Sequence, residues 1–201
     1  MNRAAPGTGL GTVRSVAAPV SAAALFPWLF YRGGLGPLDF WNGFCLVLAW
    51  TLALAWWADP CLLRRLGQRA RTRPAFGIAA GVLSAVLLYG IFAVGGVVLR
   101  AVWPAAGGWI ASVYSWKEGV SPLRAGLLMA LVIGPGEEML WRMCLQERAV
   151  RRLGTRSGVL AVALFYAAVH VTAGNPLLCL AALVGGLYWG VLYAWLRSPA
   201  A

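Results

Sequence analysis

The chain has 201 residues, of which 61% are hydrophobic and only 11% are charged, and its mean hydropathy is +0.74. A soluble domain carries about 25% charged residues, and a chain this short has no room for one beside its apolar segments. The net charge is +11, but the arginines lie between apolar segments and form no basic domain, so nucleic acid is excluded as a partner. We expect an all-α, polytopic membrane helical bundle, with residues 1–201 forming a single integral membrane domain in contact with membrane lipid.

The apolar segments predict about six transmembrane helices, because a helix needs roughly 20 apolar residues to cross a bilayer. They lie at residues 16–31, 40–58, 76–99, from 123 onward, 157–174 and 176–196. The first is the weakest, since it is short and holds Pro19 and Pro27, and we interpret it as a retained helix rather than a cleaved signal peptide. The tryptophan-containing segment 101–116 is predicted to be interfacial or re-entrant.

The distribution of basic residues predicts the orientation, because cytoplasmic loops carry an excess of lysine and arginine. Six spans would place on one side of the membrane Arg3, Arg14, Arg64, Arg65, Arg69, Arg71, Arg73, Arg142, Arg148, Arg151, Arg152, Arg156 and Arg197. The other side would receive only Arg32, Arg100, Lys117 and Arg124. We therefore expect a protein of the inner (cytoplasmic) membrane with both termini in the cytoplasm.

Two adjacent glutamates interrupt the fourth apolar segment. A carboxylate inside a bilayer costs at least about 2.5 kcal/mol, and such residues mark functional sites by default. Glu138 and Arg142 are four residues apart, so they lie on one helical face and are expected to pair. Glu137 points about 100° away from Glu138 and is left free to act on another group. The segment Gly134–Gly136 with its proline is expected to loosen the helix and leave space for water near Glu137.

The only histidine, His170, lies in the fifth segment at a depth similar to that of Glu137. Helical rise places Glu137 roughly 16 Å from Arg148, and His170 roughly 20 Å from Ser157, on the same side of the membrane. The short turn between these segments makes them antiparallel neighbours. A glutamate and a histidine around one water form a general-base pair, although a lone histidine in a helix is more often a packing residue.

Other chemistries fit less well. One histidine and two glutamates, of which one is expected to pair with an arginine, make a poor set of zinc ligands. We therefore expect no metal and no cofactor. The four cysteines have no paired spacing and predict no disulfide. A serine protease motif is missing, and the absence of a visible repeat argues mildly against a proton-coupled transporter.

Three motifs resemble those of the CPBP family, the CAAX proteases and bacteriocin-processing proteins of the membrane. "EEMLWR" (137–142) fits a Glu-Glu-x-x-x-Arg motif, "YAAVH" (166–170) resembles an aromatic-x-x-x-His motif, and "GGLYWGVLYAWLRS" (185–198) resembles the helix that follows. The resemblance covers residues 124–198. It implies a glutamic-type intramembrane endopeptidase in which Glu137 and His170 activate water, supported by Glu138 with Arg142. The implied partner is a protein or peptide substrate, such as the C-terminal signal of an exported protein.

The sequence departs from the family pattern at one point. Members usually continue into a further helix with a His-x-x-x-Asn motif that helps hold the oxyanion, and this motif is not seen before Ala201. Loss of such a donor costs roughly 100- to 1,000-fold in rate, and Asn175 is expected on the outer side, too far away to replace it. Three explanations stay open: a minimal subtype, a backbone amide as donor, or weak activity. The alternative functions are a non-catalytic scaffold or immunity protein on the same fold, or a small transporter.

Overall fold

The structure is a helical bundle, which confirms the predicted all-α polytopic membrane fold. A computed structural model describes residues 9–62, 64, 74–115 and 120–196. Within these residues, five helices are long and apolar enough to cross a membrane: Val13–Arg32, Phe40–Ala58, Gly81–Val102, Thr155–Ala173 and Pro176–Leu196. They coincide with five of the six predicted spans, so the protein is a multi-pass membrane protein.

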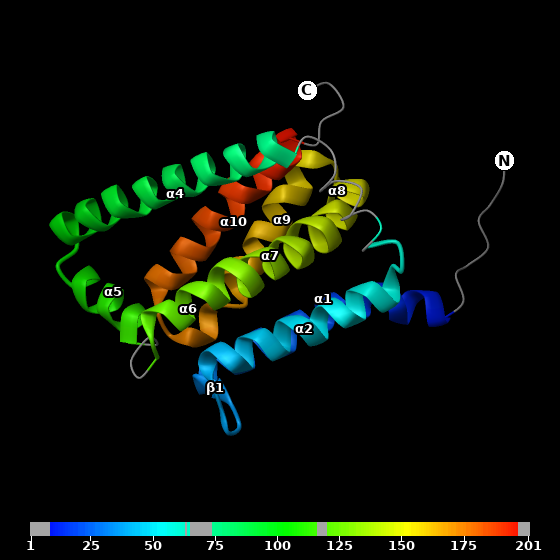
Figure 1. Ribbon diagram of the computed structural model, residues 1–201, viewed down its shortest axis with the longest axis horizontal. Coiled ribbons are helices and arrows are strands. Elements are labelled where there is room, and N and C mark those ends of the chain that lie inside the picture. The colour runs from blue at the N-terminus through cyan, green and yellow to red at the C-terminus, as the bar shows by residue number, and fades with distance from the viewer. Residues whose placement is uncertain (1–8, 63, 65–73, 116–119, 197–201) are drawn as a thin grey trace.

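Figure 1 shows how the helices and strands are arranged. In chain order they are α1 (Gly9–Arg32), the two-residue strands β1 (Gly34–Leu35) and β2 (Leu38–Asp39), α2 (Phe40–Ala58), α4 (Pro74–Val102), α5 (Ala106–Ser115), a helical segment over 122–153, α9 (Thr155–Ala168), the 3-10 turn η3 (Val171–Ala173) and α10 (Pro176–Leu196). β1 and β2 form a small antiparallel hairpin between α1 and α2. Helix α5 has ten residues, too few to cross a bilayer.

The predicted fourth span is a continuous helical segment that contains two π-helical stretches. It consists of α6 (Pro122–Leu128), the π-helix η1 (Met129–Ile133), α7 (Gly134–Glu137), the π-helix η2 (Glu138–Gln146) and α8 (Glu147–Leu153). It is not among the five helices above because no single piece of it reaches the length of a span.

Pro135 gives a physical reason for the first change of winding. A proline lacks the N–H donor, and its ring clashes with the carbonyl four residues earlier in an α-helix. The N–H of Gly134 instead bonds to the carbonyl of Met129, five residues back, as in a π-turn. The N–H of Glu147 likewise bonds to the carbonyl of Arg142 at the end of η2. The predicted loosening of the helix near the glutamates is therefore present as wider turns.

Glycines set the close packing of the last three helical segments. Gly154 has φ +79° and reverses the chain between α8 and α9, which are antiparallel neighbours as predicted. A Cβ on Gly158 would lie 2.6 Å from the backbone nitrogen of Val150, so only glycine allows this approach. On α10, the carbonyl of Gly190 accepts a 2.8 Å hydrogen bond from the buried amide of Gln146. Helices α8, α9 and α10 therefore form one tightly packed unit.

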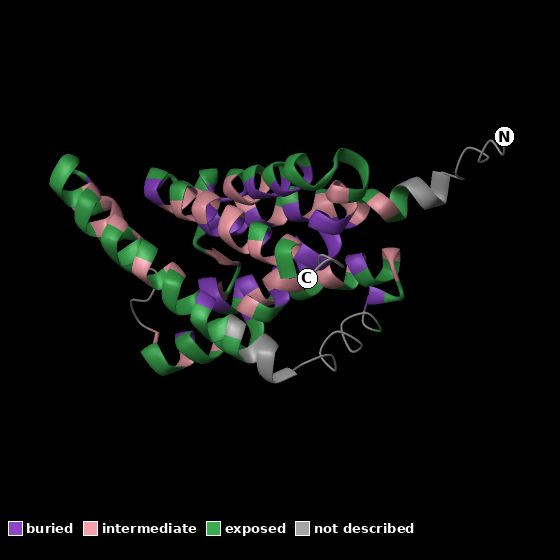
Figure 2. Ribbon diagram, turned by 90° about the horizontal axis from the view of Figure 1, so that it is seen from above, coloured by how far each residue is buried: buried purple, intermediate pink, exposed green. Residues whose placement is uncertain are grey.

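Buried residues lie between the helices, and exposed residues cover their outer faces (Figure 2). The main core contains Phe26, Phe30, Phe44, Leu48 and Trp141, which come from α1, α2 and η2. Helix α4 is the most peripheral span, since only 6% of its apolar window is buried. A hydrogen bond of 2.9 Å from the Tyr188 hydroxyl to the carbonyl of Ser84 attaches it to α10.

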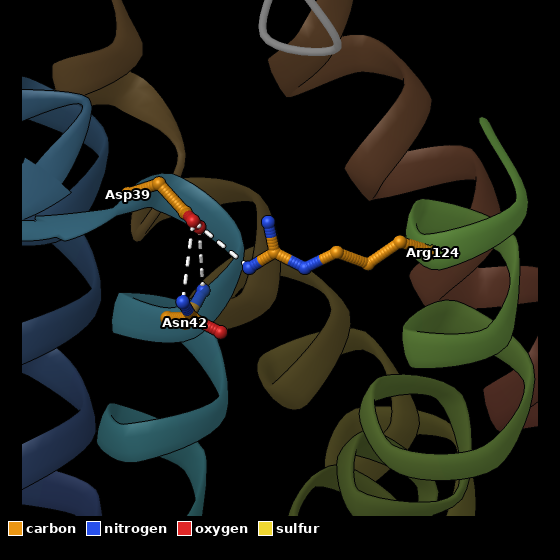
Figure 3. Close-up of polar contacts among 3 residues, drawn as sticks. All are labelled: Asp39, Asn42 and Arg124. Atoms are coloured by element: carbon orange, nitrogen blue, oxygen red, sulfur yellow. Dashed lines mark hydrogen bonds and ion pairs between the residues drawn. The ribbon is translucent and has the colours of Figure 1, made fainter. Parts of the chain in front are cut away.

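A polar contact joins α2 and α6 near the hairpin (Figure 3). Asp39 caps α2 by accepting a 2.9 Å hydrogen bond from the backbone N–H of Asn42, and its other oxygen lies 2.9 Å from Nη2 of Arg124. The Asn42 N–H, followed by the Arg124 guanidinium, holds the pKa of the Asp39 carboxyl below its ordinary value. Asp39 therefore stabilises two helices with one carboxylate.

Several arginines of the set predicted to be cytoplasmic lie at the end of the bundle opposite the hairpin. There α1 begins, α2 and α10 end, and α8 carries the "RAVRR" cluster (Figure 1). Arg14 of α1 lines the same cavity as Arg148, Arg151 and Arg152 of α8. The remaining members of the predicted set at positions 3, 65, 69, 71, 73 and 197, together with Lys117, lie outside the described residues. The cytoplasmic orientation stays a prediction.

Candidate active site

Tyr166 contacts both of the predicted site residues. Its hydroxyl donates a 3.0 Å hydrogen bond to Oε1 of Glu137, and its backbone carbonyl lies 2.7 Å from Nδ1 of His170. The Tyr166 and His170 rings also pack edge to face, with centroids 4.8 Å apart. The carboxyl of Glu137 and the imidazole of His170 are thus positioned by the same residue. A water shared by the two side chains stays a prediction.

The contact at Nδ1 fixes the tautomer of a neutral His170. A carbonyl oxygen can only accept, so Nδ1 carries the proton and donates it to the carbonyl of Tyr166. The lone pair of the neutral ring is then on Nε2. His170 is buried, and the ring of Phe30 from α1 lies 4.4 Å away between centroids. The imidazole is therefore held in one orientation, and its basic Nε2 takes no part in the contact with Tyr166.

The Glu137 carboxyl faces the aromatic side chains of its neighbours. Its Oε1 accepts the hydrogen bond from the Tyr166 hydroxyl at 3.0 Å. The half-buried Glu137 is the last residue of α7, directly before the π-helix η2. π-turns occur frequently at functional sites because they displace side chains from the regular helical register.

The predicted pair of Glu138 and Arg142 is confirmed as an ion pair, but its burial is uneven. Nε of Arg142 lies 3.5 Å from Oε1 of Glu138. The arginine side chain is only 3% exposed, whereas the glutamate side chain is 44% exposed. Nε and Nη1 of Arg142 are buried without a hydrogen-bond partner. The group that depends on the pair is therefore the arginine.

The expectation that glycines leave room for water beside Glu137 is wrong at Gly136. A Cβ on Gly136 would lie 2.5 Å from Cδ2 of Leu48, so the side chain of α2 already fills that space. At Gly134 an added Cβ would meet the carbonyl of Met129 at 2.9 Å, within the same helix. These glycines allow close helix packing and the wide turn.

Asn175 is committed to holding helices, in agreement with the expectation that it does not replace the oxyanion donor. Its amide nitrogen donates to the carbonyl of Trp109 and to the hydroxyl of Ser112, at 2.7 and 2.8 Å. Its amide oxygen accepts from the N–H groups of Leu177 and Leu178. Asn175 thereby caps α10 and attaches α5 to it.

All four cysteines are free thiols in the structure. In the parts of the chain described, no three His, Cys, Asp or Glu side chains come together as metal ligands would. The site chemistry described above consists of carboxyl, imidazole, phenol and guanidinium groups.

Residues 119–201 match a family model described as type II CAAX prenyl endopeptidase Rce1-like. The match supports a CPBP family assignment. All four predicted site residues lie within the matched segment, and the match points to a protease of the membrane. No curated protein and no solved structure matches the chain.

Two contributors to this candidate site were missed at the sequence level. Tyr166 was noted only as an aromatic residue, although a phenol in an apolar span usually needs a hydrogen-bond partner, and that need was a usable signal. Phe30 was missed because its contact with His170 joins α1 to the end of α9, and helical periodicity does not reveal which helices meet.

Proposed function

We propose that the chain is a glutamic-type intramembrane endopeptidase that hydrolyses a peptide bond of a membrane or exported protein. The observation that carries this proposal is the double contact of Tyr166, which orients Glu137 through its hydroxyl and His170 through its carbonyl. A purely structural glutamate would pair with a cation, as Glu138 does, whereas Glu137 accepts a hydrogen bond from the neutral phenol of Tyr166.

The proposed reaction uses Glu137 and His170 on one water molecule. Glu137 accepts a proton from the water, whose oxygen attacks the carbonyl carbon of the peptide, and Nε2 of His170 accepts a hydrogen bond from the same water. The carbonyl oxygen gains negative charge, which the positive charge of the nearby Arg142 stabilises. The C–N bond then breaks, and the leaving amine takes the proton from Glu137, so that an acid and an amine are formed.

The substrate class follows from the site's location and from the family description. Glu137 lies within a helical segment packed among membrane spans, so the peptide bond must belong to a chain that enters the bundle from the membrane or its surface. The matched family is named for endopeptidases of CAAX prenyl proteins. We propose the C-terminal signal of a membrane or exported protein as the substrate.

A comparison of two glutamate variants tests this function. Glu137→Gln keeps the shape and can still accept the Tyr166 hydrogen bond, but it removes the base. Glu147→Gln is the matched control, since Glu147 is buried on the same helical segment and bonds the Tyr193 hydroxyl at 2.6 Å, away from Tyr166. Cells expressing each form at equal level are compared by mass spectrometry of newly formed protein termini.

The proposal expects termini that appear with the parent and with Glu147→Gln but are lost with Glu137→Gln. General-base loss lowers the rate about 100- to 10,000-fold, enough to abolish the signal. Termini that persist unchanged with Glu137→Gln would favour the scaffold or transporter alternative.

A further inference from the structure

A cavity at the arginine-rich end of the bundle lies outside the site described above. Its volume is about 320 Å³, and its walls come from α1, the end of α2 and α8. The lining residues are Arg14, Ser15, Ala58, Arg148, Arg151 and Arg152. Four arginine residues therefore line one open space, and none of them takes part in the proposed hydrolysis.

Three of these arginines are held in place by other groups. Nη1 of Arg148 donates a 3.2 Å hydrogen bond to the carbonyl of Ser15. The guanidinium of Arg14 lies 5.0 Å from the centre of the Trp57 ring, within range of a cation–π contact. Arg151 lies 3.6 Å from Oε2 of Glu147. The cavity wall is thus preorganised, which lowers the entropy cost of binding a ligand.

The four arginines of the cavity outnumber the carboxylates beside them in the described part of the chain. Arg151 pairs with Glu147, whose carboxylate also accepts a hydrogen bond from Tyr193, and Asp59 directly follows the lining residue Ala58. Like charges at 4 Å repel by roughly 1 kcal/mol even in water. An anion in the cavity would relieve this repulsion, and guanidinium groups bind phosphate oxygens with two parallel hydrogen bonds.

The position of the cavity indicates where the anion comes from. Trp56 and Trp57 are exposed at the end of α2, beside the lining residue Ala58, and exposed tryptophans are typical of the membrane–water boundary. Lipid phosphates lie at this level. Basic pockets between membrane helices on the cytoplasmic side bind anionic headgroups.

We propose that this cavity binds the phosphate group of an anionic phospholipid, with the headgroup held between α1 and α8. The bound lipid joins the first helix to the end of the glutamate-bearing segment, which are far apart in sequence. This proposal is independent of the peptidase function, because it requires only the arginines and the cavity.

Purified protein in a neutral maltoside detergent tests the proposal by thermal unfolding. The probes are short-chain phosphatidylglycerol, the zwitterionic short-chain phosphatidylcholine, and inorganic phosphate at equal concentrations. The variants are Arg152→Gln and the double variant Arg14→Gln/Arg152→Gln. Arg156→Gln is the matched control, since Arg156 is exposed at the same end of the bundle but does not line the cavity.

The expected result is a rise in the melting temperature with phosphatidylglycerol only, of similar size in the parent and in Arg156→Gln. Each basic residue near an anionic lipid contributes about 1 kcal/mol, so the apparent affinity should fall about fivefold in Arg152→Gln and further in the double variant. If the double variant does not fold, Arg152→Gln alone carries the comparison with Arg156→Gln.

Three results would overturn the proposal. An equal response to phosphatidylcholine would mean that acyl chains, not phosphate, are bound. An equal response to inorganic phosphate would identify a free anion as the ligand. Affinities for phosphatidylglycerol that are equal in Arg152→Gln and Arg156→Gln would show that the cavity arginines do not hold it.

Discussion

The hydroxyl of Tyr166 donates a hydrogen bond to Oε1 of Glu137 across 3.0 Å, which links α9 to the helical segment that carries both glutamates. Tyr166→Phe should leave the fold intact, since the ring contacts remain, but it removes the donor that orients the carboxylate. Loss of a hydrogen bond to a buried group costs about 1–3 kcal/mol, so we expect cleavage to slow by roughly 10-fold or more.

The melting temperature of Tyr166→Phe separates orientation from folding. The rings of Trp141 and Tyr166 pack with their centroids 4.9 Å apart. A phenylalanine at position 166 keeps this contact. A variant that melts like the parent but cleaves more slowly supports the orienting role. Cleavage at the parental rate would show that Glu137 needs no donor from Tyr166.

In the ion pair of Glu138 and Arg142, the arginine is far more buried than the glutamate. We therefore expect substitution of one partner to destabilise the fold more than substitution of the other. Glu138→Gln leaves a buried guanidinium without its carboxylate, and an arginine cannot lose its charge. Breaking a truly buried pair costs about 3–5 kcal/mol, and the exposed glutamate reduces that figure here. Arg142→Met fills the same space with an apolar chain, and the remaining carboxyl can become neutral by taking up a proton.

We therefore expect Glu138→Gln to lower the melting temperature more than Arg142→Met does. Thermal unfolding of the detergent-purified proteins measures the difference. The reverse order would mean that the carboxylate, and not the guanidinium, is the group that depends on the pair.

The approach of α8 to α9 depends on one glycine. A Cβ at Gly158 would lie 2.6 Å from the backbone nitrogen of Val150, whereas a Cβ at Gly185 meets nothing within 4 Å. Overpacking typically costs about 1–3 kcal/mol, while alanine is otherwise better than glycine in a helix by up to about 1 kcal/mol. Gly158→Ala should destabilise the protein and Gly185→Ala should not. Equal melting temperatures for the two variants would contradict the packing described here.

The contact of Asp39 predicts a small loss of stability in acid. The folded-state pKa of this carboxyl is lowered by the Asn42 N–H and by Arg124, so its contribution is complete above the ordinary pKa of an aspartate. It is lost as the pH falls through the lowered folded-state pKa. Because both partners are exposed to a large extent, the effect should stay below about 1 kcal/mol.

Asp39→Asn isolates this charge, since asparagine is also a good helix cap. We expect the variant to be slightly less stable at neutral pH and to lose less stability than the parent on acidification. Melting curves from neutral pH down to the acid range measure this. A parent and a variant that respond identically to acid would exclude a role for the ionised carboxyl.

The sequence predicted well those features that depend on local composition. The last span was expected at residues 176–196, and α10 occupies Pro176–Leu196, because the length of an apolar segment marks a membrane span directly. The pairing of Glu138 with Arg142 followed from spacing alone. The neighbouring positions of the glutamate segment and α9 followed from a connection too short for any other arrangement.

Features that depend on contacts between distant segments were not predictable in this way. The spacing of Glu137 and Glu138 assumed a regular α-helix, whereas η1 and η2 have π-turns that periodicity does not reveal. Leu48 fills the space at Gly136, although the glycine alone indicated room for water. The exposure of Glu138 likewise depends on which helices cover that face.

The most direct test of the central claim, that Glu137 and His170 act together on one water, is a double-mutant cycle. Cleavage rates of a peptide substrate are measured with purified Glu137→Gln, His170→Ala and the double variant, each at equal folded concentration. We predict that each single variant falls about 100- to 10,000-fold and that the double variant is little slower than either, because residues serving one step are non-additive. A Glu137→Gln variant that cleaves as fast as the parent would contradict the account.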